Sequence, residues 1–293
     1  MESVNQALRK RKIKCANRRH RVMHCHDMKG GYNNVADGEY FEAFSSWDCI
    51  DEFCYFSHNR ITIPPAKWIN RAHEKGVLCL GTIITEHAKG VAENGLLLDN
   101  AAKAAAQLAR VCKHYAFDGY LVNIEAPLPG GASDVPRLAK FVSMLRDECR
   151  AVRKEARVIV YDSVARDGTI RWANELTPPN SETSANYALF SVADGIFLNY
   201  WWTEKHLERT RMTAAERSAD VYVGVDCFGR GPNTPGPGPA CSAAVQKCIA
   251  DYALSVAIFA PGWVMESGPA NGVSAEEAAE HDRKFWLHLF ASQ

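Results

Sequence analysis

A buried strand that ends in two polar side chains is predicted by the stretch Phe117-Asp118-Gly119-Tyr120-Leu121-Val122-Asn123-Ile124-Glu125. Side chains alternate along a strand, so Asn123 and Glu125 point to the same face. An apolar run that leads to an inward polar pair is typical of a strand at the catalytic end of a parallel barrel. A purely structural alternative is that Asn123 caps the next turn and that Glu125 pairs with a neighbouring arginine.

Similar apolar, β-rich runs recur along the whole chain, and most are followed by a helical pattern. The runs are Val22–Met28, Ile50–Ser57, Val77–Thr85, Gly119–Glu125, Val158–Ser163, Gly195–Tyr200, Val221–Phe228 and Ser255–Trp263. Apolar residues at helical spacing predict helices over Ala101–Tyr115, Val135–Val152, Cys241–Ala253 and Ala275–Phe290. This alternation predicts an α/β protein, a (β/α)8 TIM barrel over residues 22–293. No G-x-G-x-x-G follows the first run, which argues against an open dinucleotide-binding sheet.

Bulk properties argue against several functional classes. Formal net charge is zero, with 34 Lys and Arg against 34 Asp and Glu, so no overall field points to nucleic acid or a membrane. The basic segment 1–21 is interpreted as a solvated lead-in to the first strand. No apolar run is long enough to span a bilayer, and no signal-peptide core is present. The ten cysteines form no C-x-x-C pair, which indicates reduced thiols in a cytosolic protein.

Polar and aromatic residues gather where the predicted strands end, and these are the candidate site residues. They are His58, Glu86, Asn123, Glu125, Tyr161, Trp172, Asn199, Trp201, Trp202, Asp226 and Trp263. Aromatic rings stack on the apolar faces of pyranose rings, and carboxylates and amides bond sugar hydroxyls, so the set suits a sugar. The pairs His24-x-His26 and Glu86-His87 lack a second pair that would complete a metal site, so we expect no metal and no other cofactor.

The pair on the fourth predicted strand favours one kind of glycosidase chemistry. An ordinary retaining enzyme needs two carboxylates, whereas this strand supplies Glu125 and, in the second place, the amide of Asn123. That arrangement is expected when a 2-acetamido sugar attacks its own anomeric carbon and forms an oxazoline. Asn123 would hold the acetamido N–H, and Glu125 would protonate the leaving oxygen and then activate water.

The chain resembles the cytosolic endo-β-N-acetylglucosaminidases of glycoside hydrolase family 85 from about His24 onward. The matching segments are His26–Tyr32, Tyr55–His58 with Ile63–Pro65, Gly81–Glu86, Phe117–Glu125, Tyr161–Ser163, Asp220–Asp226 and Ala260–Val264. The resemblance implies hydrolysis of the β1,4 bond between the two core GlcNAc residues of N-glycans on glycoproteins, glycopeptides or free oligosaccharides. It also implies a cytosolic location, and the charge balance and the lack of a long apolar run indicate no nucleic-acid or membrane partner.

Residue roles follow from the same resemblance. It makes Asn123 the residue that orients the acetamido group, Glu125 the general acid/base, and Tyr161 a neighbour of the acetamido group. Trp172 and Trp202 match aromatics that flank the cleft.

Two departures from the family are expected. The β-sandwich domains usual in the family do not follow the barrel, and the Pro/Gly-rich tract Gly229–Pro239 forms a long loop over the cleft.

Two other functions remain open at this level. One is a catalytically impaired barrel that acts as an N-glycan-binding module, against which the intact Asn123 and Glu125 argue. The other is a glycosidase for chitin-type polymers, which also uses acetamido participation. That group carries a string of aspartates before its glutamate, whereas here Asp118 stands alone.

Overall fold

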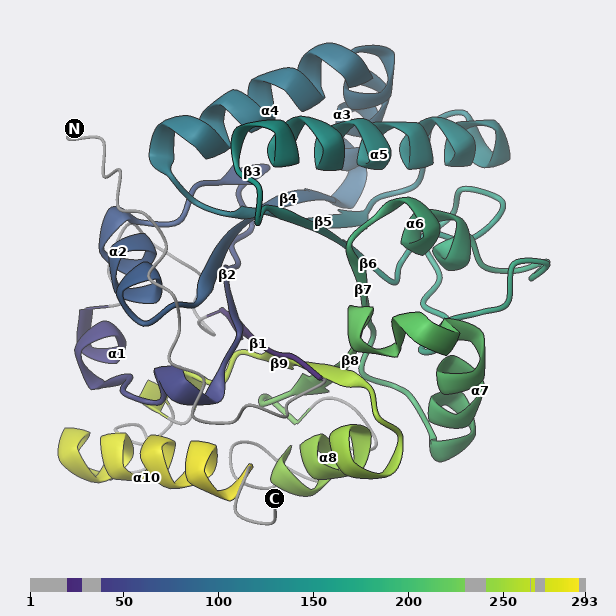
Figure 1. The fold of residues 1–293 in the computed structure, drawn as a ribbon. Coiled ribbons are helices and arrows are strands. Elements are labelled where there is room, and N and C mark those ends of the chain that lie inside the picture. The colour runs from purple at the N-terminus through teal and green to yellow at the C-terminus, as the bar shows by residue number, and fades with distance from the viewer. Residues whose placement is uncertain (1–19, 28–37, 230–240, 264, 267–271, 290–293) are drawn as a thin grey trace.

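Eight parallel strands close into a barrel in the computed structural model, which describes residues 20–27, 38–229, 241–263, 265–266 and 272–289 (Figure 1). The strands are β1 (Val22–His26), β2 (Glu52–Tyr55), β4 (Leu78–Glu86), β5 (Gly119–Glu125), β6 (Arg157–Tyr161), β7 (Gly195–Leu198), β8 (Val221–Asp226) and β9 (Ser255–Phe259). Neighbours pair in the order β2-β1-β9-β8-β7-β6-β5-β4, and pairing of β2 with β4 closes the ring. The barrel predicted from the sequence is confirmed.

Helices surround the barrel (Figure 1). They are α1 (Gly38–Ala43), α2 (Ala66–Glu74), α3 (His87–Asp99), α4 (Ala101–Tyr115), α5 (Val135–Val152), α6 (Asn186–Val192), α7 (Glu204–Ala214), α8 (Ser242–Gln246) and α10 (Ala275–His288). Helices α4 and α5 have the predicted bounds. The predicted helix Cys241–Ala253 is divided, because α8 passes into a π-helical turn over Lys247–Asp251. Among the described helices, none is both long and apolar enough to cross a membrane.

A short ninth strand, β3 (Ile61–Thr62), was not predicted. It runs antiparallel to β4, with Ile61 opposite Ile83 and Thr62 opposite Thr82. Two residues are too few to give a periodic pattern. This strand ties the segment after β2, which carries His58, to the carboxyl-terminal half of β4.

Alternation along β5 divides its side chains between the barrel interior and the helical layer. Tyr120 points outward and donates its hydroxyl proton to the Leu108 carbonyl of α4 at 2.8 Å. Leu121 packs in the separate apolar cluster that fills the barrel. Asn123 and Glu125 follow at two-residue intervals, so the pleat that buries Leu121 also directs both polar side chains into the barrel.

Buried charges fill the amino-terminal end of the barrel. Arg157 Nε lies 2.9 Å from Glu52 Oε1, and the Tyr222 hydroxyl donates to the same oxygen at 2.9 Å. Arg21 and Arg157 both contact Asp220 close by. Glu52 is completely buried, so its charge depends on these partners.

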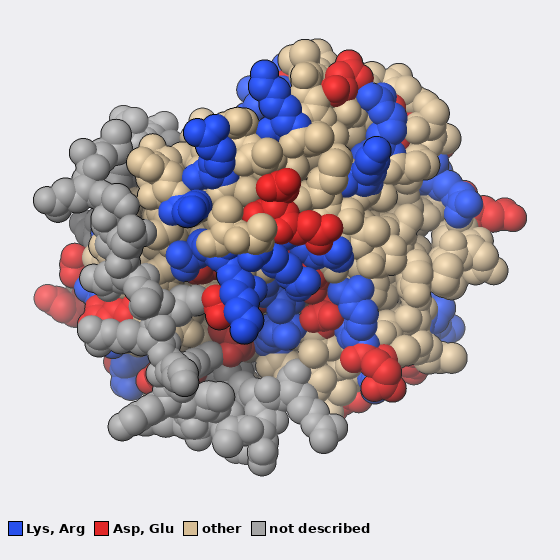
Figure 2. Space-filling view, turned by 45° about the horizontal axis from the view of Figure 1, so that its top comes forward, with Lys and Arg blue, Asp and Glu red and all other residues tan. Residues whose placement is uncertain are grey.

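Charges on the outer surface are mixed in sign. Figure 2 shows Lys and Arg side chains interspersed with Asp and Glu on the face that it presents. Ion pairs between Arg137 and Asp99 and between Arg146 and Asp147 are examples. Most of the basic lead-in and all of the Pro/Gly-rich tract except Gly229 lie outside the described residues, so those two predictions are not addressed by the fold.

Candidate active site

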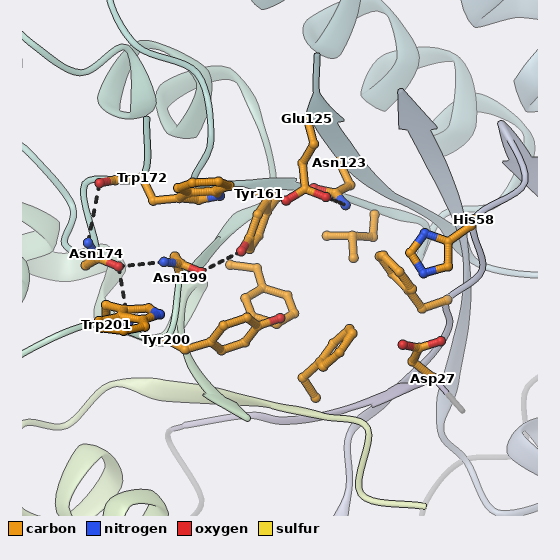
Figure 3. A pocket seen from close by; sticks show the side chains of 14 residues that line it. Asp27, His58, Asn123, Glu125, Tyr161, Trp172, Asn174, Asn199, Tyr200 and Trp201 are labelled. Atoms are coloured by element: carbon orange, nitrogen blue, oxygen red, sulfur yellow. Dashed lines mark hydrogen bonds between the residues drawn. The ribbon is translucent and has the colours of Figure 1, made fainter. Parts of the chain in front are cut away.

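A cavity of about 700 Å³ opens at the carboxyl-terminal end of the barrel (Figure 3). It is lined by Asp27, Phe56, His58, Leu121, Asn123, Glu125, Tyr161, Trp172, Asn174, Phe197, Asn199, Tyr200, Trp201 and Phe259. Leu121, Phe197 and Phe259 belong to the apolar cluster inside the barrel, which gives the cavity an apolar floor. Polar groups project over this floor from several strand ends, as expected for a barrel that binds a ligand.

Asn123 and Glu125 lie side by side on the cavity wall (Figure 3). Asn123 Nδ2 donates to Glu125 Oε2 at 3.1 Å, and Asn123 is only 3% exposed. The Glu125 oxygen accepts in this contact, so the amide turns its NH2 group toward Glu125. Asn123 Oδ1 is thereby directed elsewhere, and it has no hydrogen-bond partner among the described atoms. A buried acceptor without a partner is ready to bind an N–H or O–H of a ligand.

The end of β5 is held from behind by the next strand. Ser163, just after β6, donates its hydroxyl proton to the Ile124 carbonyl at 2.5 Å. Ile124 is buried between the two polar residues. This bond fixes the strand where Asn123 and Glu125 leave it, so their spacing does not depend on the bond between their own side chains.

Tyr161 faces the same cavity from the end of β6. Its hydroxyl donates to Asn199 Oδ1 at 2.7 Å, and Asn199 Nδ2 donates to Asn174 Oδ1 at 2.7 Å. Its ring packs edge-on against Phe197 with centroids 5.4 Å apart. The phenol is therefore held by packing on one side and by a chain of amides on the other.

Two tryptophans stand at the rim of the cavity with large exposed surfaces. Trp172 is 46% exposed and Trp201 is 55% exposed. Figure 3 places both on the side of the cavity that carries Asn174, across from His58 and Asp27. Exposed indole faces beside a polar cavity are suited to stacking against the C–H face of a sugar.

The model of glycosyl hydrolase family 85 matches residues 27–292. The chain belongs to glycosyl hydrolase family 85. It is 41% identical over 280 residues to "Cytosolic endo-beta-N-acetylglucosaminidase" of Gallus gallus and 39% identical over 285 residues to the protein of that name from Homo sapiens. These alignments cover 92% and 94% of this chain but 36% of each relative, so the chain spans just over a third of their length.

Solved structures with low sequence identity share the fold. The glycoside hydrolase domain of Endo-D from Streptococcus pneumoniae R6 superposes with a TM-score of 0.68 at 18% identity, over 89% of this chain and 42% of that one. A chitinase from Chromobacterium violaceum gives 0.59 at 11% identity, over 91% and 98%. The barrel is therefore shared beyond family 85 itself.

Four predicted site residues of this family 85 chain lie outside the cavity lining. Trp202 is buried, and its indole N–H donates to the Gly224 carbonyl at 2.8 Å. Asp226 is buried at the end of β8, where it accepts from the Phe228 N–H at 3.1 Å. Trp263 packs edge-on against Phe228 with centroids 5.6 Å apart. Their predicted contact with substrate therefore has no support from the cavity geometry.

The fourth predicted residue outside the lining is Glu86, which contacts His58, a residue that does line the cavity. Both of its carboxylate oxygens are 3.1 Å from His58 Nδ1. The structure thus brings the two predicted residues together, with the carboxylate holding the imidazole rather than facing the cavity. An acceptor at Nδ1 favours the tautomer that carries its proton there.

Sequence reasoning missed Asn174, whose side chain lies between the two rim tryptophans. Residues with no regular structure surround it, so no periodic pattern marks it. Its backbone is left-handed, with φ of 60°, a conformation that Asn adopts more readily than most residues. Its N–H donates to buried Asp162 at 2.7 Å, and burial raises the pKa of Asp162 to about 6. That contact across the turn is tertiary, so the sequence alone does not reveal it.

Proposed function

We propose that this chain is the barrel of an endo-β-N-acetylglucosaminidase that hydrolyses the β1,4 bond between the two core GlcNAc residues of N-glycans. The observation that carries the proposal is the pairing of Asn123 with Glu125 in a deep cavity with an apolar floor. A carboxylate whose neighbour on the strand is an oriented amide, rather than a second carboxylate, suits a substrate that supplies its own nucleophile. The printed names of the chicken and human relatives support the same substrate class.

In the first step the acetamido oxygen of the sugar attacks its anomeric carbon while the glycosidic bond breaks. Asn123 Oδ1 accepts the acetamido N–H, which increases electron density on the attacking oxygen. Glu125 gives its proton to the leaving oxygen, so the departing GlcNAc leaves as a neutral alcohol. The product on the enzyme is an oxazolinium ion, charge-balanced by the Glu125 carboxylate.

In the second step water adds to the anomeric carbon from the face that the leaving group vacated. Glu125 now takes the proton from this water, and the ring opens to restore the acetamido group. Two inversions at the same carbon give net retention. The bond from Ser163 to the Ile124 carbonyl holds this end of the strand through both steps, and the NH2 group of Asn123 contacts Glu125 Oε2.

The substrates proposed are N-glycans on glycoproteins or glycopeptides and free oligosaccharides, and the proposed location is the cytosol. The names of the relatives support that location. None of the nine cysteines in the described part of the chain forms a disulfide, which fits a reducing compartment.

The test is incubation of the purified chain with a high-mannose glycopeptide, followed by mass spectrometry. The expected products are a peptide that keeps one GlcNAc and a glycan that ends in one GlcNAc. Glu125→Gln should lower kcat by about a hundredfold or more, because it removes the proton donor. Glu148→Gln, on the exposed side of α5, is the matched control. Unchanged substrate with folded wild-type protein, or full activity in Glu125→Gln, would contradict the proposal.

A further inference from the structure

A histidine and a glutamate form a pair on the wall of the cavity that lies opposite the rim tryptophans. Both carboxylate oxygens of Glu86 lie 3.1 Å from His58 Nδ1. Figure 3 places His58 across the cavity from Trp172 and Trp201. The side chain of His58 is 56% exposed and that of Glu86 is 14% exposed. The imidazole is therefore the member of the pair that a ligand can reach.

Strand order sets the position of His58 relative to the proposed acid. His58 follows β2, which pairs with β4, and β4 in turn pairs with β5, with Glu86 opposite Glu125. Neighbouring strands lie about 4.8 Å apart, so two strand positions separate His58 from Glu125 around the barrel. This arrangement suits a ligand of more than one sugar, in which Glu125 and His58 contact different rings.

The segment that carries His58 is fastened in place by the protein itself. Ser57 Oγ lies 2.5 Å from Thr62 Oγ1, and β3, which contains Thr62, pairs with β4. The imidazole packs edge-on against the buried ring of Phe56, with centroids 5.7 Å apart. A side chain that is already held in this way loses little conformational entropy when it binds a ligand.

The carboxylate of Glu86 determines which nitrogen of His58 carries the proton. An ionised carboxylate can only accept hydrogen bonds, so Nδ1 donates to Glu86. In the neutral ring the other nitrogen, Nε2, then carries a lone pair. The two nitrogens point in different directions, so Nε2 is turned away from Glu86, and none of the residues that the structure describes bonds to it. The pair thus offers one hydrogen-bond acceptor to the cavity.

The two walls of the cavity suit different sugars of the proposed substrate. The β-linked core GlcNAc carries all its ring substituents in equatorial positions, so its faces are C–H surfaces that stack on indole. The mannose attached to the cleaved GlcNAc has an axial 2-hydroxyl, which stands off the ring face and needs a polar partner. The wall with Trp172 and Trp201 therefore suits GlcNAc, whereas the wall with His58 suits the mannose.

We propose that His58 is a specificity-determining residue whose Nε2 accepts a hydrogen bond from a hydroxyl of this mannose, with Glu86 as the positioning residue that fixes the tautomer. The identity of the sugar rests on the proposed function. A contact away from the broken bond is made equally in the ground state and in the transition state. His58 should therefore affect the affinity for glycan and leave the chemical step unchanged.

The first test is calorimetric binding of the two product halves, a high-mannose glycan that ends in one GlcNAc and a peptide that keeps one GlcNAc. His58→Asn keeps an N–H for Glu86 but has no acceptor at the position of Nε2. Its Kd for the glycan should rise about fivefold, as for loss of one neutral hydrogen bond, and its Kd for the peptide should stay within about twofold. His114→Asn, exposed at the end of α4, is the matched control. An unchanged Kd for the glycan, or an equal rise for the peptide, would overturn the inference.

Kinetics on the high-mannose glycopeptide separate recognition from chemistry. In His58→Asn, KM should rise about fivefold while kcat stays within about twofold of wild type. A fall in kcat at constant KM would overturn the inference, because it would place His58 in the chemical step. Hydrolysis by wild type and its loss in Glu125→Gln report on the proposed function separately, and the binding test requires no hydrolysis.

A spectroscopic measurement tests the positioning role of Glu86 without any turnover. In 15N-histidine-labelled protein at pH 8, His58 should show a protonated Nδ1 and an unprotonated Nε2. Addition of the glycan should shift the Nε2 signal of His58 and leave the signals of exposed His114 unchanged. Glu86→Leu removes the acceptor and should move the proton of His58 toward Nε2. A protonated Nε2 in wild type, or an unchanged tautomer in folded Glu86→Leu, would overturn the inference.

Discussion

At the scale of single residues, the proposed mechanism depends on having an amide and not a second carboxylate beside Glu125. Asn123 Nδ2 is 3.1 Å from the Glu125 carboxylate. An aspartate at position 123 would place two acids in contact, and they would compete for one proton. The amide instead donates to Glu125, and in the proposed mechanism its oxygen accepts from the ligand. We therefore expect that aspartate cannot replace Asn123, although the two side chains have a similar shape.

A prediction at this scale concerns Asn123→Ala. We expect kcat on natural glycopeptide to fall by about a hundredfold, as for loss of a preorganised transition-state contact. A preformed sugar oxazoline should still be hydrolysed within about tenfold of the wild-type rate, because the step that needs Asn123 is already complete. Glu125→Gln is the control. Because the attacking water still needs a base, this variant should hydrolyse neither substrate. The measurement is kcat of Asn123→Ala on each of the two substrates. Equal losses of kcat on both would contradict the role proposed for Asn123.

The sequence was enough to predict the residues whose placement follows from strand alternation. Asn123 and Glu125 face the cavity because they lie two positions apart on β5. Adjacent tryptophans were harder to separate, since Trp201 and Trp202 follow β7 directly and only the packed structure shows which one is buried. The position of Asn174 depends on contacts with residues of other loops, and no local sequence pattern predicts such contacts.

At the scale of secondary-structure elements, helix α10 carries a buried acid on its packed face. The helix begins with a capping box between Ser274 and Glu277. Its buried positions include Ala278, Asp282, Phe285 and Trp286, which follow the helical spacing. Burial raises the pKa of Asp282 to about 7, and contact with the Trp286 side chain offsets this only in part. An acid on an otherwise apolar stripe makes the stability of the element depend on pH.

The second prediction is that Asp282→Asn stabilises the protein at pH 8 but not at pH 4. A folded-state pKa raised from 3.8 to about 7 means that the folded protein binds the extra proton between these values. Stability from this group is therefore complete below about pH 4 and is lost as the pH rises through about 7. The variant should gain roughly 3 kcal/mol in free energy of unfolding at pH 8, measured by urea denaturation. Asp147→Asn, exposed on α5, is the control, and an equal gain at both pH values would contradict the assignment.

Elements were predicted best where a long amphipathic pattern coincides with a packed helix or a buried strand. Helices α4 and α5 were placed at their observed ends for this reason. The prediction for Cys241–Ala253 was less accurate because a π-helical turn interrupts the regular spacing after α8. β3 was missed because its pairing with β4 is tertiary and only two residues take part.

At the scale of the whole molecule, the two ends of the barrel differ in the side chains that they bury. The carboxyl-terminal end carries the cavity, whereas the amino-terminal end carries the buried cluster of Glu52, Arg157 and Tyr222. In barrels of this kind the first end is associated with chemistry and the second with stability. Substitutions at the two ends should therefore be separable in their effects.

The last prediction tests this separation with Arg157→Met. Removing the cation leaves the Glu52 carboxylate buried without the cation that contacts it, which should cost about 3 kcal/mol or more in free energy of unfolding. In the double variant with Glu52→Gln, the amide still accepts from Tyr222 and position 52 no longer carries a buried charge, so at least half of this loss should be recovered. Arg283→Met, which breaks only a surface pair with Glu280, should leave the free energy of unfolding nearly unchanged. Folded Arg157→Met should keep kcat/KM on the glycopeptide within about twofold, because the cavity lies at the other end of the strands. A tenfold loss of kcat/KM without loss of stability would show that the two ends are coupled.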